Sequence, residues 1–211
     1  MKKFLTLASF FVFSQSAFAL FELRGGYGVH SGTMSTLNTG LNTFSQCGEG
    51  CNASGTMGFN FDALVSPWPF GLGLGLRQEN FQTKFSFSPI STDITYKFSR
   101  LALLLNYRLI DTLIYFGPIA SFGLSGSSSL DTGILGISRN ANARSTSSYS
   151  LGLEGGVKLL GFSAGLELGY SSLVGSDYVD SNSSVLTVGG TSINNLGLSG
   201  TYVKAILGFG F

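Results

Sequence analysis

The chain contains one histidine, His30, and Ser31 follows it directly. A histidine can act as a general acid or base, and such a base can activate a serine hydroxyl beside it as a nucleophile. The rest of the sequence shows no nucleophile elbow, no paired catalytic carboxylates and no cluster of metal-ligand type. A lone histidine near a strand end is more often a polar loop residue. We therefore predict a protein that is not an enzyme, with no catalytic residue, metal site or cofactor.

Two cysteines, Cys47 and Cys51, enclose Gly48-Glu49-Gly50 in a stretch rich in Ser, Thr, Asn and Gly. The two glycines make a tight ring easy to close, so the spacing predicts a local disulfide on the surface. The alternative is a two-thiol metal site. It lacks a neighbouring histidine and is disfavoured in an oxidising compartment.

The composition excludes several classes of protein. Only 11% of the 211 residues are charged, against about 25% in a typical soluble domain. Beyond the N-terminus there is no apolar run of ~20 residues, which excludes a polytopic helical membrane protein. The 19 Phe and 8 Tyr argue against disorder, and 12 basic against 11 acidic residues leave no surplus for binding nucleic acid.

The N-terminus has the organisation of a secretory signal peptide. Lys2 and Lys3 precede an apolar stretch at 4–13, and Ala17-Phe18-Ala19 provides small residues at a cleavage site. A short hydrophobic anchor is the alternative, but the stretch is about half of the ~20 residues that a spanning helix needs. We assign 1–19 to the signal peptide and 20–211 to the mature domain.

After residue 20 the hydrophobic pattern has a period of two, which indicates β-strands. Residues 94–98 and 101–109 alternate with opposite parity, which predicts a bulge near Ser99 or a separate loop strand. Pro118 is awkward within a paired strand and makes the fifth segment the least regular. The alternating segments are 21–29, 57–65, 70–76, 101–109, 114–124, 149–159, 162–170 and 203–211.

Short turns and long polar links alternate between these segments. The long links are 31–55, 78–93, 125–148 and 171–195, and their composition predicts mobile loops without a packed core. Short turns on one side and long loops on the other are typical of outer-membrane barrels. The pattern predicts an all-β fold, an eight-stranded antiparallel up-and-down transmembrane β-barrel. A ten-stranded variant remains open, because 185–190 could begin another hairpin.

One face of each segment carries Phe, Leu, Val and Tyr, and the other carries Gly, Ser and scattered charges. In a soluble sandwich or lipocalin-like barrel the apolar face would form the core. So few charges on the polar face favour the inverted arrangement, with the apolar face in lipid. Aromatic residues near the segment ends then predict girdles at the membrane interfaces: Tyr27, Tyr107, Tyr115, Tyr149, Tyr170 and Trp68.

The polar face of an eight-stranded barrel lines a lumen that side chains can fill. Its acids and bases are nearly balanced, and they should pair across the lumen because an unpaired buried charge is expensive. The alternative is an ion-conducting or gated pore. The predicted lumen network is Glu22, Arg24, Asp62, Arg77, Glu79, Arg100, Arg108, Glu154, Lys158, Glu167 and Lys204.

The C-terminal segment 202–211 ends in Phe209-Gly210-Phe211, with apolar residues at alternating positions. With the signal peptide, it resembles the small outer-membrane β-barrel family of the OmpA and OmpX type, over the whole mature chain. The resemblance implies that Phe209 and Phe211 form the signal read by the barrel-assembly machinery. No sequence follows Phe211, so we do not expect the peptidoglycan-binding domain that the two-domain members of this family carry. Some members modify lipid A with a rim His, Ser and acid, but no second motif supports His30 here.

These observations predict a barrel of the bacterial outer membrane with a structural or surface-interaction role, a plugged lumen and four long external loops. The alternatives are a small ion or solute channel and, less favoured, an enzyme acting on outer-membrane lipid. Expected partners are outer-membrane lipid, the barrel-assembly machinery and a surface ligand bound by the loops. Nucleic acid is not expected, and the protein is expected to be a monomer.

Overall fold

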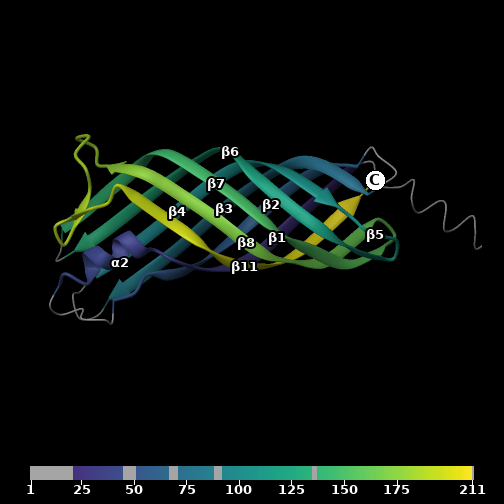
Figure 1. Ribbon diagram of the computed structural model, residues 1–211, viewed down its shortest axis with the longest axis horizontal. Coiled ribbons are helices and arrows are strands. Elements are labelled where there is room, and N and C mark those ends of the chain that lie inside the picture. Colours follow the sequence, from purple (N-terminus) through teal and green to yellow (C-terminus); the bar gives the residue numbers. More distant parts are fainter. Residues whose placement is uncertain (1–20, 45–50, 67–70, 88–91, 135–136, 211) are drawn as a thin grey trace, which may run out of the picture.

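The computed structural model describes residues 21–44, 51–66, 71–87, 92–134 and 137–210. Within these ranges the chain forms a closed barrel of eight long antiparallel strands (Figure 1). The predicted signal peptide at 1–19 lies outside the described residues. The barrel strands are β1 (Phe21–Thr33), β2 (Ser54–Val65), β3 (Leu72–Phe87), β4 (Thr92–Tyr107), β6 (Ile114–Ile134), β7 (Ile137–Leu159), β8 (Phe162–Val179) and β11 (Asn195–Gly210).

The strands are ordered β4-β3-β2-β1-β11-β8-β7-β6, and pairing of β4 with β6 closes the barrel. The first and last strands of the described chain, β1 and β11, are neighbours. Closure leaves no long strand with an unpaired edge, as a barrel in lipid requires. The predicted eight-stranded antiparallel barrel is confirmed. The ten-stranded alternative is wrong, because β9 (Thr187–Val188) and β10 (Thr191–Ser192) form only a small separate hairpin.

Two of the predicted loops are strands instead. Most of 78–93 continues β3 and β4, and most of 125–148 continues β6 and β7, which reach 21 and 23 residues. A tilted transmembrane strand needs only about 9–11 residues, so the barrel extends well beyond the membrane. Serine and glycine made these stretches look like loops. In water a strand needs no apolar outer face, because pairing with its neighbours satisfies its backbone.

The change of parity before residue 101 is not caused by a bulge at Ser99. Strand β4 is continuous, and its register with β3 shows no shift. Tyr96 and Phe98 point inward and are buried, whereas Leu101 and Leu103 lie on the outer face. The irregularity lies opposite, in β6, where Leu124 is an extra residue between the partners of Leu101 and Ala102. The parity changes because the apolar face of β4 switches from the inside of the barrel to the outside.

The interior therefore has two parts. The half near the short turns holds charged side chains, and the half beyond them holds an apolar core. We call the second part the outer core. Its buried residues are Met34, Leu37, Leu41, Cys51, Ala53, Phe81, Phe87, Ile94, Tyr96, Phe98, Leu130, Ala141, Leu173, Tyr178, Leu186, Val188, Ile193, Leu196 and Leu198. Burial raises the pKa of the Tyr178 phenol to about 12.

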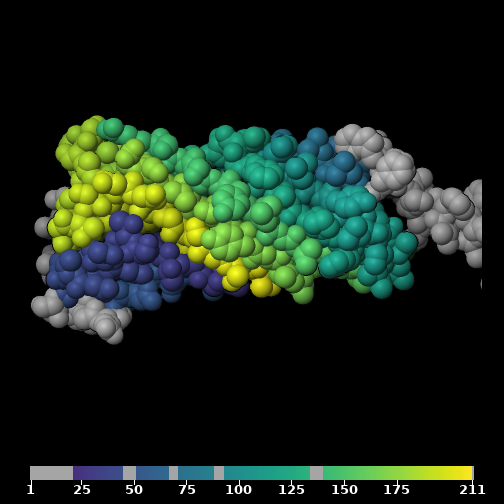
Figure 2. All heavy atoms as spheres, in the orientation of Figure 1, coloured from purple at the N-terminus to yellow at the C-terminus, as the bar shows by residue number. Residues whose placement is uncertain are grey.

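A short helix, α2 (Ser35–Leu41), covers the outer end of the barrel. Figure 2 shows it in purple at the end far from the C-terminus, beside the lime and yellow residues that lead into β11. The Asn38 amide donates to Asn52 Oδ1 at 2.6 Å and accepts from the Ala53 N–H at 2.7 Å. Thr43 Oγ1 donates to the Gly189 carbonyl at 2.9 Å. The described parts of the first loop are thus packed into the barrel mouth. No helix in the described ranges is long and apolar enough to cross a membrane.

The outer surface of the other half is an apolar belt. Exposed apolar residues occur on each barrel strand, such as Phe61, Leu76 and Leu151 at 54%, 47% and 52% exposure. Of the predicted girdle residues, Tyr27, Tyr107, Tyr149 and Tyr170 do face outward. The prediction is wrong for Tyr115, which is 1% exposed and points into the lumen. Trp68 lies outside the described residues.

Glycines on the inner face make room for this tyrosine. A Cβ on Gly165 would lie 2.2 Å from the Tyr115 hydroxyl and 2.5 Å from the Gly155 carbonyl. We expect Gly165→Ala to lower the free energy of unfolding by about 1–3 kcal/mol, because the added methyl overpacks the lumen. Gly25→Ala is the matched control, since nothing lies within 4 Å of its Cβ position. Urea titration of both variants in lipid vesicles measures the effect, and equal midpoints would contradict it.

Candidate functional site

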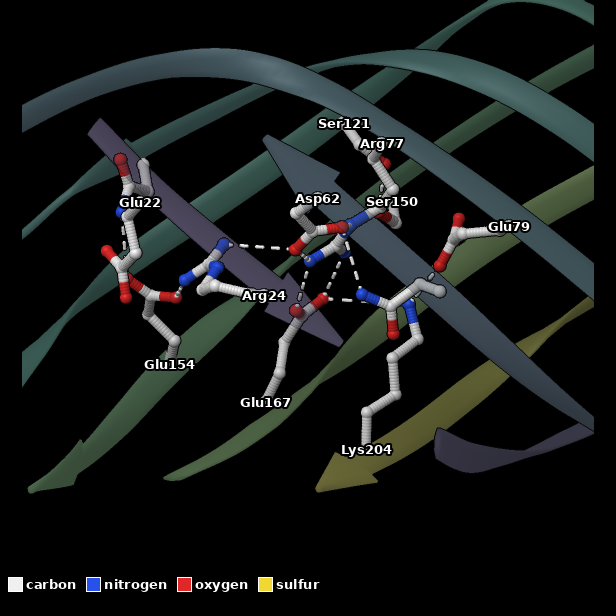
Figure 3. A network of polar contacts seen from close by, with 12 residues as sticks. Glu22, Arg24, Asp62, Arg77, Glu79, Ser121, Ser150, Glu154, Glu167 and Lys204 are labelled. Carbon is white, nitrogen blue, oxygen red and sulfur yellow. Dashed lines mark hydrogen bonds and ion pairs between the residues drawn. The ribbon is translucent and has the colours of Figure 1, made fainter. Parts of the chain in front are cut away.

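The charged part of the lumen is a network of ion pairs drawn from strands all around the barrel (Figure 3). It contains five acids and five bases, and each of them is at least 95% buried and paired with another. The network residues are Glu22, Arg24, Asp62, Arg77, Glu79, Arg100, Arg108, Glu154, Glu167 and Lys204. The equal numbers leave the buried lumen without formal net charge.

Arg77 on β3 lies at the centre of the network. Its Nε and Nη2 atoms each donate to an oxygen of Asp62 at 2.8 Å. Its Nη1 and Nη2 atoms donate to Glu167 at 2.8 and 2.7 Å. Two bidentate pairs on one guanidinium are a strong and geometrically specific arrangement. Arg77 thereby connects neighbouring strand β2 with β8 on the opposite wall.

The network continues toward the short turns through Arg24. Its Nη2 atom lies 3.2 Å from Asp62 and its Nη1 atom 2.5 Å from Glu154. Arg108 donates to Glu154 at 3.1 Å and to Glu22 at 2.7 Å, and its guanidinium lies 4.7 Å from the centre of the Tyr115 ring. These contacts fill the lumen close to its inner end.

The network continues toward the outer core through Lys204. Its ammonium contacts Glu79 and lies 3.8 Å from Glu167. Glu79 also accepts from Arg100 Nε at 2.5 Å, and the Tyr202 hydroxyl donates to Glu167 at 2.8 Å. The charges are therefore linked without a break from Glu22 to Arg100. In the described residues, the paired charges fill the lumen as side chains fill a packed core. They do not line one side of an open passage.

Lys158, which the sequence placed in this network, lies at its edge and is linked to Arg108 only through Asp111, 3.9 Å from the Arg108 guanidinium. It lies at the rim near the short turns, where its ammonium contacts Asp111 and its side chain is 22% exposed. Its strand parity is correct, but it is only one residue from the end of β7. A side chain at that height reaches water instead of the lumen centre.

The side chains of His30 and Ser31 lie on opposite faces of strand β1. His30 points inward and is 3% exposed, its Nδ1 atom 2.9 Å from Ser171 Oγ and its ring stacked 5.2 Å from Tyr202. Ser31 points outward and contacts Thr201. The expected position of His30 at the outer rim is wrong, because the strands continue beyond it. Adjacent strand residues face opposite sides, so the two side chains cannot share one substrate.

The remaining predicted residues are only partly described. Cys51 is disulfide-bonded but is 2% exposed inside the outer core, so its expected position on the surface is wrong. Its predicted partner Cys47 lies outside the described residues, and their pairing stays a prediction. Phe209 faces outward and its ring centre lies 5.0 Å from that of Phe162. Phe211 lies outside the described residues. In the described part of the chain no group of His, Cys, Asp or Glu could hold a metal ion.

Sequence reasoning missed the outer core and its cover. It treated 31–55 and 171–195 as unpacked, yet Leu37, Leu41 and Leu186 from these links are buried. One signal was present, namely the inverted parity of Ile94, Tyr96 and Phe98. It indicates an apolar inner face in the outer half of the barrel, which must be covered by something apolar.

The closed strand order, the apolar belt and the filled polar lumen define the class of protein. The chain has the fold of the small bacterial outer-membrane β-barrels, and the belt places it in that membrane.

The comparisons with known proteins agree with this class. No protein-family model and no curated protein matches the chain. Among solved structures it is similar to Ail, the attachment invasion locus protein of Yersinia pestis, in complex with sucrose octasulfate. The two are 12% identical with a TM-score of 0.51, over 90% of this chain and 97% of Ail. A major outer membrane protein from Thermus thermophilus is 11% identical with a TM-score of 0.51, over 90% and 98% of the two chains. At these identities the similarity concerns the fold alone.

Proposed function

We propose that the protein is a non-conducting surface barrel, which presents its extended outer end to a partner and catalyses no reaction. The observation that carries the proposal is the filled interior. The charged network blocks the inner half, the outer core blocks the outer half, and α2 covers the mouth. Each of these would have to rearrange before an ion could pass. The energy of the buried ion pairs opposes such a change.

The outer end is suited to contact because paired strands form its surface. Strands β6 and β7 stay in register from Ser129 to Ile134, opposite Ile137 to Asn142. Their outer half lies beyond the apolar belt, where a ligand outside the cell can reach it. We propose that the protein acts there as a monomer, after insertion by the barrel-assembly machinery. The separation of His30 from Ser31 supports a role without catalysis.

Conductance measurements test the proposal. Purified protein reconstituted in planar bilayers should give no steady current steps at moderate voltage, because buried side chains fill the lumen in the described part of the chain. A large porin in the same bilayers is the positive control, and a shift in gel mobility on boiling confirms that the test protein is folded. Reproducible steps from folded protein would contradict the proposal and favour the small-channel alternative.

A further inference from the structure

A shallow groove of about 480 Å³ crosses the outer wall of the barrel from β1 to β7. It follows the cross-strand register and runs perpendicular to the strands. Phe59 on β2 lies opposite Asn80 on β3, Asn80 opposite Ser99 on β4, and Ser99 opposite Ser127 on β6. Beyond these, Ser129 is paired with Asn142 on β7. From β3 to β7 the outward side chains along this line are short, which leaves the groove open there.

The groove climbs out of the apolar belt. At the β1–β2 end it is lined by Tyr27, Met57 and Phe59, which are 57%, 55% and 57% exposed. At the other end it passes Ser127, beyond the last belt aromatic of β6, and Asn142, well beyond Tyr149 on β7. Strand tilt explains the climb, because a line perpendicular to tilted strands is itself inclined to the membrane. One groove thus joins lipid to water.

Between these two ends, the floor of the groove is polar, although the outer faces of the neighbouring strand segments are apolar. Gln78, which lies next to the lining residues Asn80 and Ser99, faces outward with Phe61 and Leu101 as its cross-strand neighbours. Its amide donates to Ser99 Oγ at 3.0 Å, which donates to Asn80 Oδ1 at 2.8 Å. Each of these amides has more donors and acceptors than the chain of bonds uses. At the edge of the lipid, such spare groups are stabilised by a polar ligand.

The charge of the groove selects among polar ligands. The ammonium of Lys97 is 3.6 Å from Asp131, and both side chains are partly exposed. The local charge is therefore balanced, which gives little preference for a phosphate. Apart from Lys97, the outward side chains that line the groove from β3 to β7 carry hydroxyl or amide groups, and these match the hydroxyls of a sugar.

We propose that this groove binds a glycolipid of the outer leaflet. The acyl chain lies against Tyr27, Met57 and Phe59, and an uncharged, hydroxyl-rich headgroup lies over Asn80, Ser99 and Ser127. The proposal does not depend on the closed lumen, because it concerns only the outer wall.

Native mass spectrometry tests the proposal directly. The folded protein is released from mild detergent to which a diacyl glucosyl lipid or phosphatidylglycerol with the same acyl chains has been added. We expect the wild type to retain one glucosyl lipid in preference to phosphatidylglycerol. A double variant, Ser99→Leu with Ser127→Leu, fills the floor and should retain the glucosyl lipid about tenfold less, since it loses hydrogen bonds and space.

Two further variants complete the test. Ser31→Leu with Thr201→Leu makes the same change on outward hydroxyls at β1 and β11, outside the groove, and should retain the glucosyl lipid as the wild type does. Lys97→Met should also retain it. Equal retention by the groove-filled and control variants would overturn the proposal. So would a preference for phosphatidylglycerol that Lys97→Met removes, or a dimer in place of the lipid adduct.

Discussion

Replacing Arg77 by methionine should lower the free energy of unfolding by about 3–5 kcal/mol, the cost of breaking a buried ion pair by removing one partner. Methionine retains much of the volume but leaves two buried carboxylates, Asp62 and Glu167, without the guanidinium that bridges them. Asp62 keeps only the longer contact with Arg24 and an amide bond from Asn60 at 2.9 Å. The midpoint of urea unfolding in lipid vesicles, followed by gel mobility, measures the loss.

Two controls show whether burial causes this effect. Lys84→Met removes a cation from the ion pair with Asp93, whose side chains are 59% and 56% exposed, and should change the midpoint very little. Combining Arg77→Met with Asp62→Asn restores equal numbers of buried acids and bases, and Glu167 keeps its contacts with Lys204 and Tyr202, so the double variant should recover much of the stability. A loss in the single variant no larger than that of Lys84→Met would show that water reaches the network.

Replacing Leu37 by aspartate should release α2 from the barrel mouth while the transmembrane part stays folded. Leu37 is fully buried in the outer core, and a carboxylate there has no described basic partner. Its burial cost of about 3 kcal/mol corresponds to about 100-fold faster amide hydrogen exchange in α2, because opening becomes easier by that amount. The urea midpoint of the whole barrel should change little, since the charged network is separate from the outer core.

Thr39→Asp is the control for this experiment, because Thr39 lies on the exposed side of the same helix. Its exchange rates in α2 should stay close to those of the wild type. The Leu37→Asp protein should also remain silent in planar bilayers, because the network still fills the inner half. A conducting Leu37→Asp variant would show that α2 alone closes the barrel, and equal exchange in both variants would show that α2 is not packed as described.

The transmembrane half of the fold follows directly from the sequence. In lipid, each strand needs apolar residues on alternate positions. Arg24, Arg77 and Glu167 lie among glycines on the remaining positions, and few other folds combine charged and glycine residues in this two-residue alternation. The charged side chains must then face inward and pair, whatever their exact partners. Sequence alone could not supply the partners, since strand spacing does not reveal which of the charges across the lumen come within reach.

The outer half could not be predicted in the same way. Above the membrane the outer face of a strand is free to be polar, so the alternation that identifies a strand weakens, as in 125–134. The apolar positions move to the inside of the barrel, so Ile94 and Tyr96 have the opposite parity to the apolar residues of the transmembrane part. Burial of His30 follows from the same extension. Tyr115 was misplaced because Leu113, Tyr115 and Ile119 are apolar on both parities, and only the neighbouring Gly156 and Gly165 show which side has room for a ring.

The added length of β6 and β7 also determines how far these two strands project above the lipid. Tyr149 is the last belt aromatic of β7, and the strand begins twelve positions earlier at Ile137. At ~3.3 Å per residue and a tilt near 40°, this length places the last described pair of the two strands, Ile134 and Ile137, about 30 Å above the lipid. A headgroup layer of ordinary thickness ends well below that height. A bulky ligand can therefore meet this end of the β6–β7 pair without entering the lipid headgroups.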